Sequence, residues 1–259
     1  MAVYFPDEGF EPENPEDDEA LWRYIDFTQF ISILETENLW FSAASEFTDQ
    51  WEGGLTEHQV EQIADDIPSF IENGTNSVRQ LYDALRATTY ISCWHHRDEE
   101  TAAMWELYND RGKEVAIKTT VGNLRRALRW SDDMVMGCVE YKDYNSGGDL
   151  FPVTRNSPFF HKRLSFEHES EFRVVKSEFN LPERVGMEEG LREIVAEKGG
   201  AGRPIGVNQE TLIDEVVVSP VVGGWMGELV KDVLETYEME DTEVSDSKLG
   251  DNPFSLDKE

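Results

Sequence analysis

The sequence predicts an α+β fold: a single domain on a central mixed or antiparallel sheet with interspersed helices, two facing sheets being the alternative. Three observations lead to this prediction. Strand-like and helix-like patterns follow one another irregularly, without the strand–helix repeat of a doubly wound parallel sheet. The length of 259 residues is near the upper limit for one core. A hydrophobic content of 39%, with 7 Trp and 14 Phe, fills such a core and excludes a disordered acidic protein.

The first elements follow from short apolar runs and one capping residue. Residues 21–25 (LWRYI) and 39–43 (LWFSA) are typical of strands. Between them, Asp26 is suited to cap a helix whose apolar face includes Phe30 and Leu34. The segment FTDQWEGG that follows is expected to form a loop.

The remaining patterns continue this mixture. Further strands are expected at 88–95, 113–119, 134–144, 169–176 and 214–219. Further helices are expected at about 55–72, 75–87, 100–108, 121–130, 188–197 and 225–238. Asp98 is expected to cap the helix at 100–108.

Acidic, flexible ends are expected to flank the domain. Residues 1–20 hold eight acidic residues, three prolines and no basic residue, which predicts an extended arm unless its aromatic side chains dock it. The domain is expected to span 21–238, and residues 239–259 to form a similar acidic tail.

The charge of the chain indicates its surroundings. The formal net charge is −31, and carboxylates recur in nearly every segment. This distribution favours a surface adapted to a salt-loving, haloarchaeal-type cytoplasm, because molar salt screens self-repulsion beyond about 3 Å. An acidic partner-binding protein in an ordinary cell is the alternative.

Cysteine content and hydropathy agree with a cytoplasmic location. Cys93 and Cys138 are too few for a disulfide framework and are expected to be reduced, buried thiols. We find no leader-like segment and no apolar run near the ~20 residues of a membrane span, so no contact with a membrane is expected.

One stretch departs from the general acidity. Residues 111–176 carry 12 Lys and Arg against 9 Asp and Glu, a net charge of +3. Cations kept in so acidic a chain predict an anionic partner: a nucleotide or other phosphate-bearing ligand, with nucleic acid as an alternative. At 121–130, a solvated basic face is favoured over a nucleic-acid stripe, because no aromatic residues interleave with Arg125, Arg126 and Arg129.

Two polar residues within apolar strands are candidate site residues. Arg23 follows Leu21 and Trp22, where an unpaired charge is costly, so it must reach solvent at a sheet edge or bind an anion. Ser92 lies within TTYISCWHH, where alternation places it on one strand face and Cys93 on the other. A serine bonded to the backbone is the ordinary alternative.

The segment EHESEFRVV contains the densest set of charges. A period of two places Glu167, Glu169, Glu171 and Arg173 on one face of the strand expected there. Aligned carboxylates repel one another unless cations or a ligand balance them. Lys162, with Arg173, is expected to supply that balance, either in a solvated ion-pair ladder or beside a sugar or metal.

Common nucleotide and hydrolase motifs are absent. The chain has no GxxxxGK[ST] loop, no GxSxG elbow and no GxGxxG after a strand, which disfavours mononucleotide kinases, α/β-hydrolases and Rossmann enzymes. The histidine spacing does not match a zinc site, so no metal is expected.

Four segments together resemble a microbial family, domain of unknown function 2971. They are LWRYIDFTQFISILETENLWFSAASEFTDQWEG, ISCWHHRDEETAAMWELYNDRGKEVAIKT, FFHKRLSFEHESEFRVV and IDEVVVSP. They follow one another in the family's order over about residues 21–220. The loop FTDQWEG departs from the family, which more often has Asn and Pro around the Asp. This resemblance implies a fold-level grouping and no particular reaction.

The chain also resembles ADP-ribosyltransferases in the order of Arg23, Ser92 and the Glu169-x-Glu171 pair. This resemblance implies NAD as the bound nucleotide, Arg23 on its pyrophosphate or ribose, and Ser92 on the nicotinamide ribose. Glu171 would hold the ribose 2′-hydroxyl while positive charge develops. The ring that stacks on nicotinamide would come from an aromatic residue: Tyr24, Tyr90 or Trp94.

Two further classes of function stay open. A non-catalytic module would use the same Arg, Lys and Glu residues, Lys162 and Arg173 among them, to bind a nucleotide, a nucleic-acid end or a protein. A Mg²⁺-dependent nuclease would cluster Asp49, Glu52, Glu169 and Glu171 around the ion. A transferase needs Arg23, Ser92 and Glu171 in one cleft, whereas the binding module needs only the basic surface.

Overall fold

The computed structural model describes residues 10–49, 51–66, 74–108, 113–131, 133–145, 150–179, 187–221 and 224–250. The chain divides into two compact units. The first unit contains Met1–Asn14, Trp40–Cys93 and Trp130–Pro204, and the second contains Pro15–Leu39, Trp94–Arg129 and Ile205–Glu259. Strand β3 (Thr89–His96) has its first residues in the first unit and its last residues in the second.

In the second unit, β1 (Ala20–Asp26) lies between two antiparallel neighbours. It pairs with β4 (Glu114–Thr120) along its whole length and with the end of β3, where Leu21 stands opposite His96. Strand β4 also pairs with β10 (Glu215–Val218), and β10 pairs in parallel with β11 (Glu243–Asp246). Arg23 therefore lies on a central strand, which corrects the expectation of a solvated Arg at a sheet edge.

The helices of the second unit include the one that Asp26 was expected to cap. They are α1 (Phe27–Thr36), α4 (Ala102–Leu107), α5 (Val121–Ala127), α7 (Gln209–Leu212) and α8 (Trp225–Thr236). The Asp26 side chain accepts hydrogen bonds from the backbone of Thr28 and Gln29, and Gln29 completes a capping box. The expected cap of α4 was wrong: Thr101, not Asp98, is the N-cap, because its hydroxyl accepts from Met104 N at 3.4 Å.

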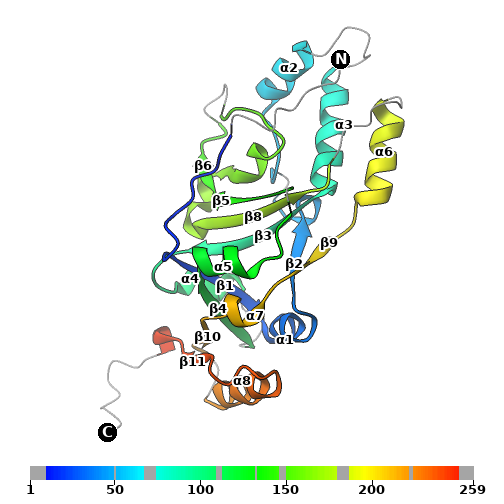
Figure 1. Cartoon of the computed structure of the whole chain (residues 1–259). Helices are drawn as coiled ribbons and strands as arrows, with labels where there is room; N and C mark the ends of the chain where they lie inside the picture. The colour runs from blue at the N-terminus through cyan, green and yellow to red at the C-terminus, as the bar shows by residue number, and fades with distance from the viewer. Residues whose placement is uncertain are drawn as a thin grey trace. The chain divides into compact units, whose positions relative to one another are not determined.

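In the first unit, β3 pairs with β2 (Asn38–Ala43) and with β8 (Glu171–Ser177), which in turn pairs antiparallel with β5 (Met134–Cys138). Figure 1 shows β5 and β8 side by side. The long strand expected at 134–144 is divided, because its residues up to Cys138 pair with β8 whereas β6 (Glu140–Lys142) pairs with another strand. That partner is β7 (His161–Arg163), in a separate parallel pair.

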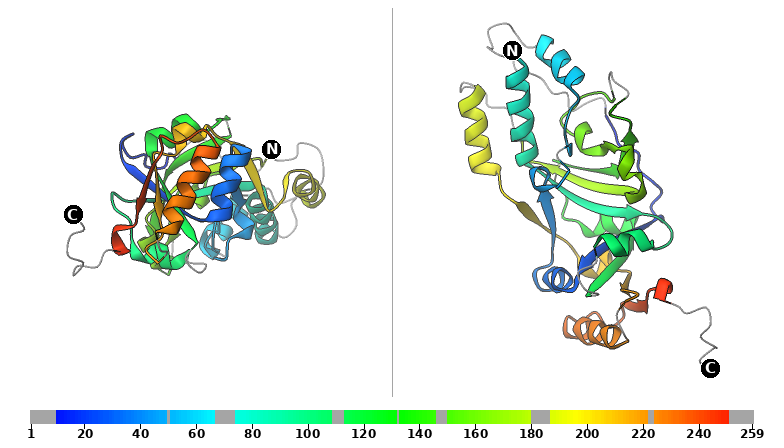
Figure 2. Two further views of the ribbon diagram at one scale, coloured as in Figure 1. Left: turned by 90° about the horizontal axis from the view of Figure 1, so that it is seen from below. Right: turned by 180° about the vertical axis from the view of Figure 1, so that it is seen from behind.

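The remaining elements of the first unit are helical, apart from β9 (Gly202–Gly206), whose last two residues belong to the second unit. The α-helices are α2 (Glu57–Asp66), α3 (Gly74–Ala87) and α6 (Met187–Lys198), and α3 and α6 lie alongside each other (Figure 1, Figure 2). Short 3₁₀ helices occupy Ala44–Glu46, Ser157–Phe160 and Leu164–Glu169. Part of the helix expected at 55–72 falls outside the described residues.

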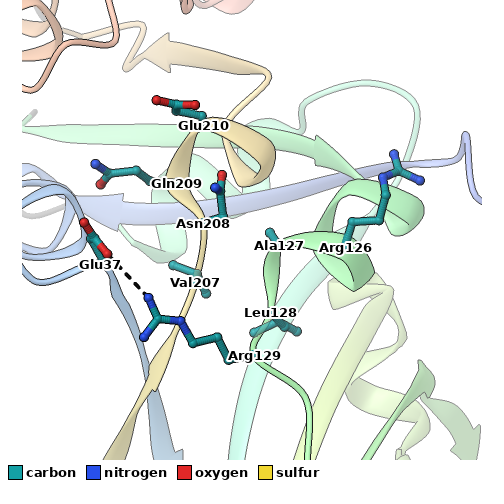
Figure 3. A pocket seen from close by; sticks show the side chains of 9 residues that line it. All are labelled: Glu37, Arg126, Ala127, Leu128, Arg129, Val207, Asn208, Gln209 and Glu210. Atoms are coloured by element: carbon teal, nitrogen blue, oxygen red, sulfur yellow. Dashed lines mark ion pairs between the residues drawn. The ribbon is translucent and has the colours of Figure 1, made fainter.

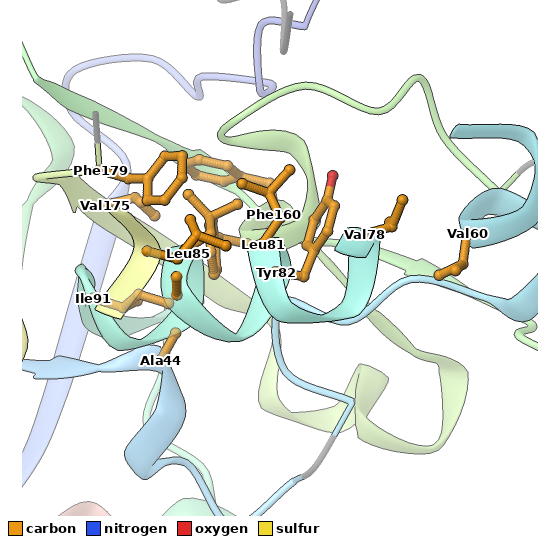
Figure 4. Close-up of a cluster of buried hydrophobic side chains, with 13 residues drawn as sticks. Ala44, Val60, Val78, Leu81, Tyr82, Leu85, Ile91, Phe160, Val175 and Phe179 are labelled. Atoms are coloured by element: carbon orange, nitrogen blue, oxygen red, sulfur yellow. The ribbon is translucent and has the colours of Figure 1, made fainter. Parts of the chain in front are cut away.

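Each unit has an apolar core. In the first unit, Leu81 and Leu85 of α3 pack with Ile91, Phe160 and Val175 (Figure 4). A smaller cluster in the second unit contains Trp22, Tyr24, Met104, Trp105, Ala116 and Val217. These packed faces explain why the apolar runs of the sequence form strands and helices.

The α+β class with a central mixed sheet is confirmed. Nine described strands belong to the main sheet, in which antiparallel pairs are joined by the parallel pair β10–β11. Across the described part of the chain, no helix has the length and apolar character that crossing a membrane requires. Cys93 and Cys138 are free thiols.

Parts of the two expected acidic ends belong to regular structure. Residues 1–9 lie outside the described part of the chain, but Phe10 packs against Phe160 and His161 at 5.9 and 5.3 Å between ring centroids. In the expected tail, Glu243–Asp246 form β11 and Lys248–Gly250 a 3₁₀ turn. The described parts of both ends are therefore fixed by packing or strand pairing.

Candidate functional site

A tight turn in the first unit buries Glu52. The backbone of Glu52 donates to Asp49 O at 3.0 Å, and Gly53 adopts a φ of 65°. A Cβ atom on Gly53 would lie 2.4 Å from the ring of Phe159, so both its conformation and its surroundings favour glycine. The turn places the Glu52 side chain, only 1% exposed, inside the unit.

Arg173 on β8 is the centre of a buried charge network. Its side chain has no exposed surface, and it donates to both carboxylate oxygens of Glu52, at 2.5 and 3.0 Å. It also donates to Phe159 O at 2.7 Å and, through Nε, to Glu171. Burial alone would lower the pKa of Arg173, but Glu171 and Glu52 raise it well above its ordinary value. Arg173 therefore stays charged and fixes both carboxylates.

Lys162 on β7 extends this network to a third carboxylate. Its Nζ atom donates to Glu171 at 2.7 Å and to Glu169 at 2.6 Å, and lies 4.6 Å from the centroid of the Phe166 ring. Burial opposes its charge, yet the two carboxylates raise the pKa of Lys162 above its ordinary value. A single ammonium group thus bridges Glu169 and Glu171.

Glu169 and Glu171 differ in their protonation. Burial, with the hydrogen bond and charge of Glu171, raises the pKa of Glu169 from 4.5 to about 7, although Lys162 acts in the opposite direction. Burial would also raise the pKa of Glu171, but Arg173 and Lys162 hold it well below 4.5. One carboxylate is therefore ionised across the neutral range while its neighbour gains or loses a proton there.

The structure corrects the expected register of EHESEFRVV. Glu167 and Glu169 lie in the 3₁₀ helix Leu164–Glu169 and not on a strand, and Ser170 follows with a φ of 41°. Only Glu171 and Arg173 share the face of β8. Glu169 still reaches the network through Lys162, whereas Glu167 is exposed.

Ser92 does not share a face with these groups. Ile91 and Cys93 of β3 pack in the same core as Val175, which lies on the same face of β8 as Glu171. Cys93 is close enough that the charge of Glu171, added to burial, raises the pKa of its thiol. Ser92, buried and 1% exposed, therefore points to the opposite face of β3 from Glu171. The structure does not bring together these two residues expected in one cleft.

Arg23, Tyr24 and Trp94 belong to the second unit, where aromatic packing surrounds them. The Arg23 guanidinium lies 5.5 Å from the centroid of the Trp94 ring. Tyr24 meets Trp105 edge to face at 4.9 Å, and burial raises its pKa to about 12. Tyr24 and Trp94 are 3% and 2% exposed, so their rings serve the packing of this unit.

A pocket of about 400 Å³ opens elsewhere in the second unit (Figure 3). Arg129 extends across it toward Glu37, and the two side chains, both largely exposed, form an ion pair at 3.6 Å. Leu128 and Val207 contribute apolar surface, and Gln209 an amide. On α5, Arg125 pairs with Asp17, so the basic residues of 121–130 do not form one continuous open stripe.

The carboxylates expected around Mg²⁺ are each paired with a cationic side chain. Asp49 accepts from Arg163 at 2.8 Å, Glu52 from Arg173, and Glu169 and Glu171 from Lys162. Among the described residues, no group of three or more His, Cys, Asp or Glu side chains is arranged to hold a metal ion. The described residues therefore give the nuclease hypothesis no carboxylate cluster that could hold Mg²⁺.

Two tyrosines beside the network were not found from the sequence. The Tyr141 hydroxyl accepts from Glu171 N at 2.8 Å, and the Tyr144 hydroxyl donates to His161 O at 3.4 Å. Burial raises the pKa of both hydroxyls, with the charge of Glu171 adding to the effect on Tyr141 and that of Glu52 to the effect on Tyr144. Nothing in the motif MVMGCVEYKDY distinguishes them from ordinary strand tyrosines.

The chain was compared with known proteins. No family model matches it, and no curated protein matches it. Solved structures of Thermus sp. 2.9 DarT do match. The complex with NAD⁺ aligns over 92% of this chain and 100% of DarT, with a TM-score of 0.39 and 10% identity. The complex with ADP-ribosylated ssDNA aligns over 92% of this chain and 98% of DarT, with a TM-score of 0.38 and 8% identity. The complex with carba-NAD⁺ aligns over 90% of this chain and 97% of DarT, with a TM-score of 0.36 and 10% identity. The resemblance to domain of unknown function 2971 stays a prediction.

Proposed function

We propose that this protein transfers ADP-ribose from NAD to an acceptor, with Glu169 and Glu171 as its reacting carboxylates. One observation carries the proposal: two carboxyl groups share Lys162, and their pKa values are displaced in opposite directions. Such a pair divides the roles of charge stabiliser and proton acceptor between two groups of the same type.

The proposed step breaks the bond between C1′ of the ribose and the nicotinamide nitrogen. The bonding electrons leave with nicotinamide, and a lone pair of the acceptor forms the new bond to C1′. Glu171, ionised, stabilises the positive charge that develops on the ribose. Glu169, with a pKa of about 7, takes the proton that the acceptor loses.

The remaining predicted residues have different parts in this proposal. The donor groups of Arg173 and Lys162 are engaged with carboxylates within the protein. In this proposal these two residues therefore position Glu171 and keep it ionised. Binding of the pyrophosphate by Arg23 stays a prediction for the second unit. Ser92 has no part in the proposed step, because it faces away from Glu171.

The test is NAD⁺ binding by calorimetry and nicotinamide release by chromatography, both in molar KCl, where the charge of −31 is screened. Glu171→Gln keeps the shape and removes the charge, so release should fall by about 100-fold or more. Glu169→Gln should lower release in the presence of an acceptor. Arg23→Ala should weaken NAD⁺ binding.

The matched control is Glu167→Gln, an exposed carboxylate of the same segment, which should leave release unchanged. Folded wild-type protein that neither binds NAD⁺ nor releases nicotinamide would overturn the proposal. Binding without release, unaffected by Glu171→Gln, would indicate the non-catalytic nucleotide-binding module instead.

A further inference from the structure

A small pocket of about 250 Å³ lies in the first unit, beside the turn that carries Glu52. Trp51, the neighbour of Glu52 in the chain, lines it together with Tyr144, whose ring meets the indole edge to face at 5.7 Å. Trp51 is 43% exposed. An accessible indole held by a second ring provides a stacking surface for a flat heteroaromatic group.

The polar lining of this pocket includes two cationic side chains, Lys142 and Arg163, beside Asp143. Each cation also has a carboxylate partner: Lys142 pairs with Glu140 at 2.6 Å, and Arg163 with Asp49 at 2.8 Å. Arg163 is held over the Phe166 ring at 5.2 Å and bonded to Asp49, so its guanidinium is oriented before any ligand arrives. An oriented guanidinium beside aromatic rings can donate to a polar group on a ring that stacks there.

The pair of Arg163 and Asp49 is incompletely satisfied. Arg163 Nε and Asp49 Oδ2 are both buried, and within the described residues neither has a hydrogen-bond partner. A buried donor and a buried acceptor without partners cost free energy unless a ligand or water meets them. Nε itself is buried, but the Arg163 side chain lines the pocket and is 37% exposed, so its guanidinium is within reach of a ligand there.

The pocket is linked to the carboxylate network by the chain itself. Arg163 follows Lys162 on β7, and Trp51 precedes Glu52 in the turn. The charges of Glu52 and Arg173 shift the pKa of Tyr144, in addition to burial, so this lining residue is within electrostatic reach of the network. The pocket is smaller than the roughly 300–1,000 Å³ typical of sites for drug-sized ligands, which limits it to part of a dinucleotide.

We propose that this pocket binds the ring of a nucleotide, with Trp51 as the stacking surface and Arg163 as the hydrogen-bond donor. The role of this pocket in a reaction rests on the proposed function. Binding of the nucleotide ring can be measured without any transfer of ADP-ribose. Adenine and nicotinamide nucleotides share the required chemistry, a flat heteroaromatic ring joined to a phosphorylated sugar.

The test is calorimetry in molar KCl with three probes: AMP, nicotinamide mononucleotide and ribose 5-phosphate. At least one of the two ring-bearing nucleotides should bind, and ribose 5-phosphate should bind at least tenfold more weakly. Comparing AMP with nicotinamide mononucleotide identifies which ring the pocket takes. Neither AMP nor ribose 5-phosphate can release nicotinamide, so the proposed function can fail while this binding persists.

The decisive variant is Trp51→Ala, with Trp40→Ala as its control, because Trp40 is also in the first unit and is 51% exposed. Trp51→Ala should weaken binding of the ring-bearing nucleotide about fivefold or more, and Trp40→Ala should leave it unchanged. Arg163→Lys, which keeps the charge and removes the planar guanidinium, should also weaken it. Equal loss in both tryptophan variants, equal binding of ribose 5-phosphate, or no binding by folded protein would each overturn the proposal.

Discussion

Two sets of carboxylates, one in each unit, are held in different ways. In the first, Glu52 and Glu171 are almost completely buried and are neutralised by Arg173 and Lys162. In the second, the partly exposed Glu100 accepts from neutral donors: the Trp105 indole at 2.7 Å, the Ser247 hydroxyl at 2.6 Å and the Lys248 backbone at 2.7 Å. The buried Glu52 and Glu171 are thus matched by full charges, whereas the partly exposed Glu100 accepts hydrogen bonds from neutral groups.

The largest effect should come from removing the central cation. Arg173→Met leaves Glu52 and Glu171 buried without a guanidinium, and we expect a loss of about 3–5 kcal/mol in the free energy of unfolding. Urea denaturation in molar KCl measures it. Arg192→Met is the matched control, because Arg192 is 77% exposed and its pair with Glu188 is a surface pair, so it should change stability little. Similar losses in both variants would show that burial does not separate the two kinds of ion pair.

The next effect concerns pH. Because the pKa of Glu169 is raised from 4.5 to about 7, the folded protein keeps a proton there that the unfolded chain loses. The stability from this group is fully present below pH 4.5 and is lost as the pH rises through about 7. Glu169→Gln should remove that decline in urea midpoints between pH 4.5 and 8. The exposed Glu167→Gln should retain it, and a decline that persists in Glu169→Gln would assign the proton to another group.

The smallest of these effects should be found in the second unit. Glu100→Gln keeps one acceptor oxygen and replaces the other by an amide NH₂. It therefore loses the charge-assisted hydrogen bonds from Trp105 and Ser247, which share Oε2, or the one from Lys248 N to Oε1, at a cost of about 1–2 kcal/mol. The same urea series measures it. A loss as large as that of Arg173→Met would remove the distinction between the two units.

Local signals predicted much of the fold. Asp26 caps its helix as expected, because a side chain two or three residues from its partners needs no tertiary structure. The division of 134–144 into β5 and β6 was not predictable, because it depends on pairing with β8 and β7. Strand β11 was missed for the same reason, since its partner is β10.

The site was predictable only in part. Lys162, Glu169, Glu171 and Arg173 lie close together in sequence, and the structure joins them in one network. The pairing of Glu52 with Arg173 spans 121 residues, and that of Asp49 with Arg163 spans 114, so no local pattern could reveal either. Ser92 was misplaced because its order in the sequence carries no information on which sheet face it occupies.

Strand β11 ends the order of strands in the described sheet, and it is only four residues long. An outermost strand is the natural point for self-association, because its unpaired backbone groups can extend the sheet into a second copy. Exposed Glu243 and Asp246 oppose such an extension by like-charge repulsion. Molar salt weakens that repulsion together with the rest of the surface field. At molar salt, therefore, the shortness of this strand would limit self-association more than its charge does.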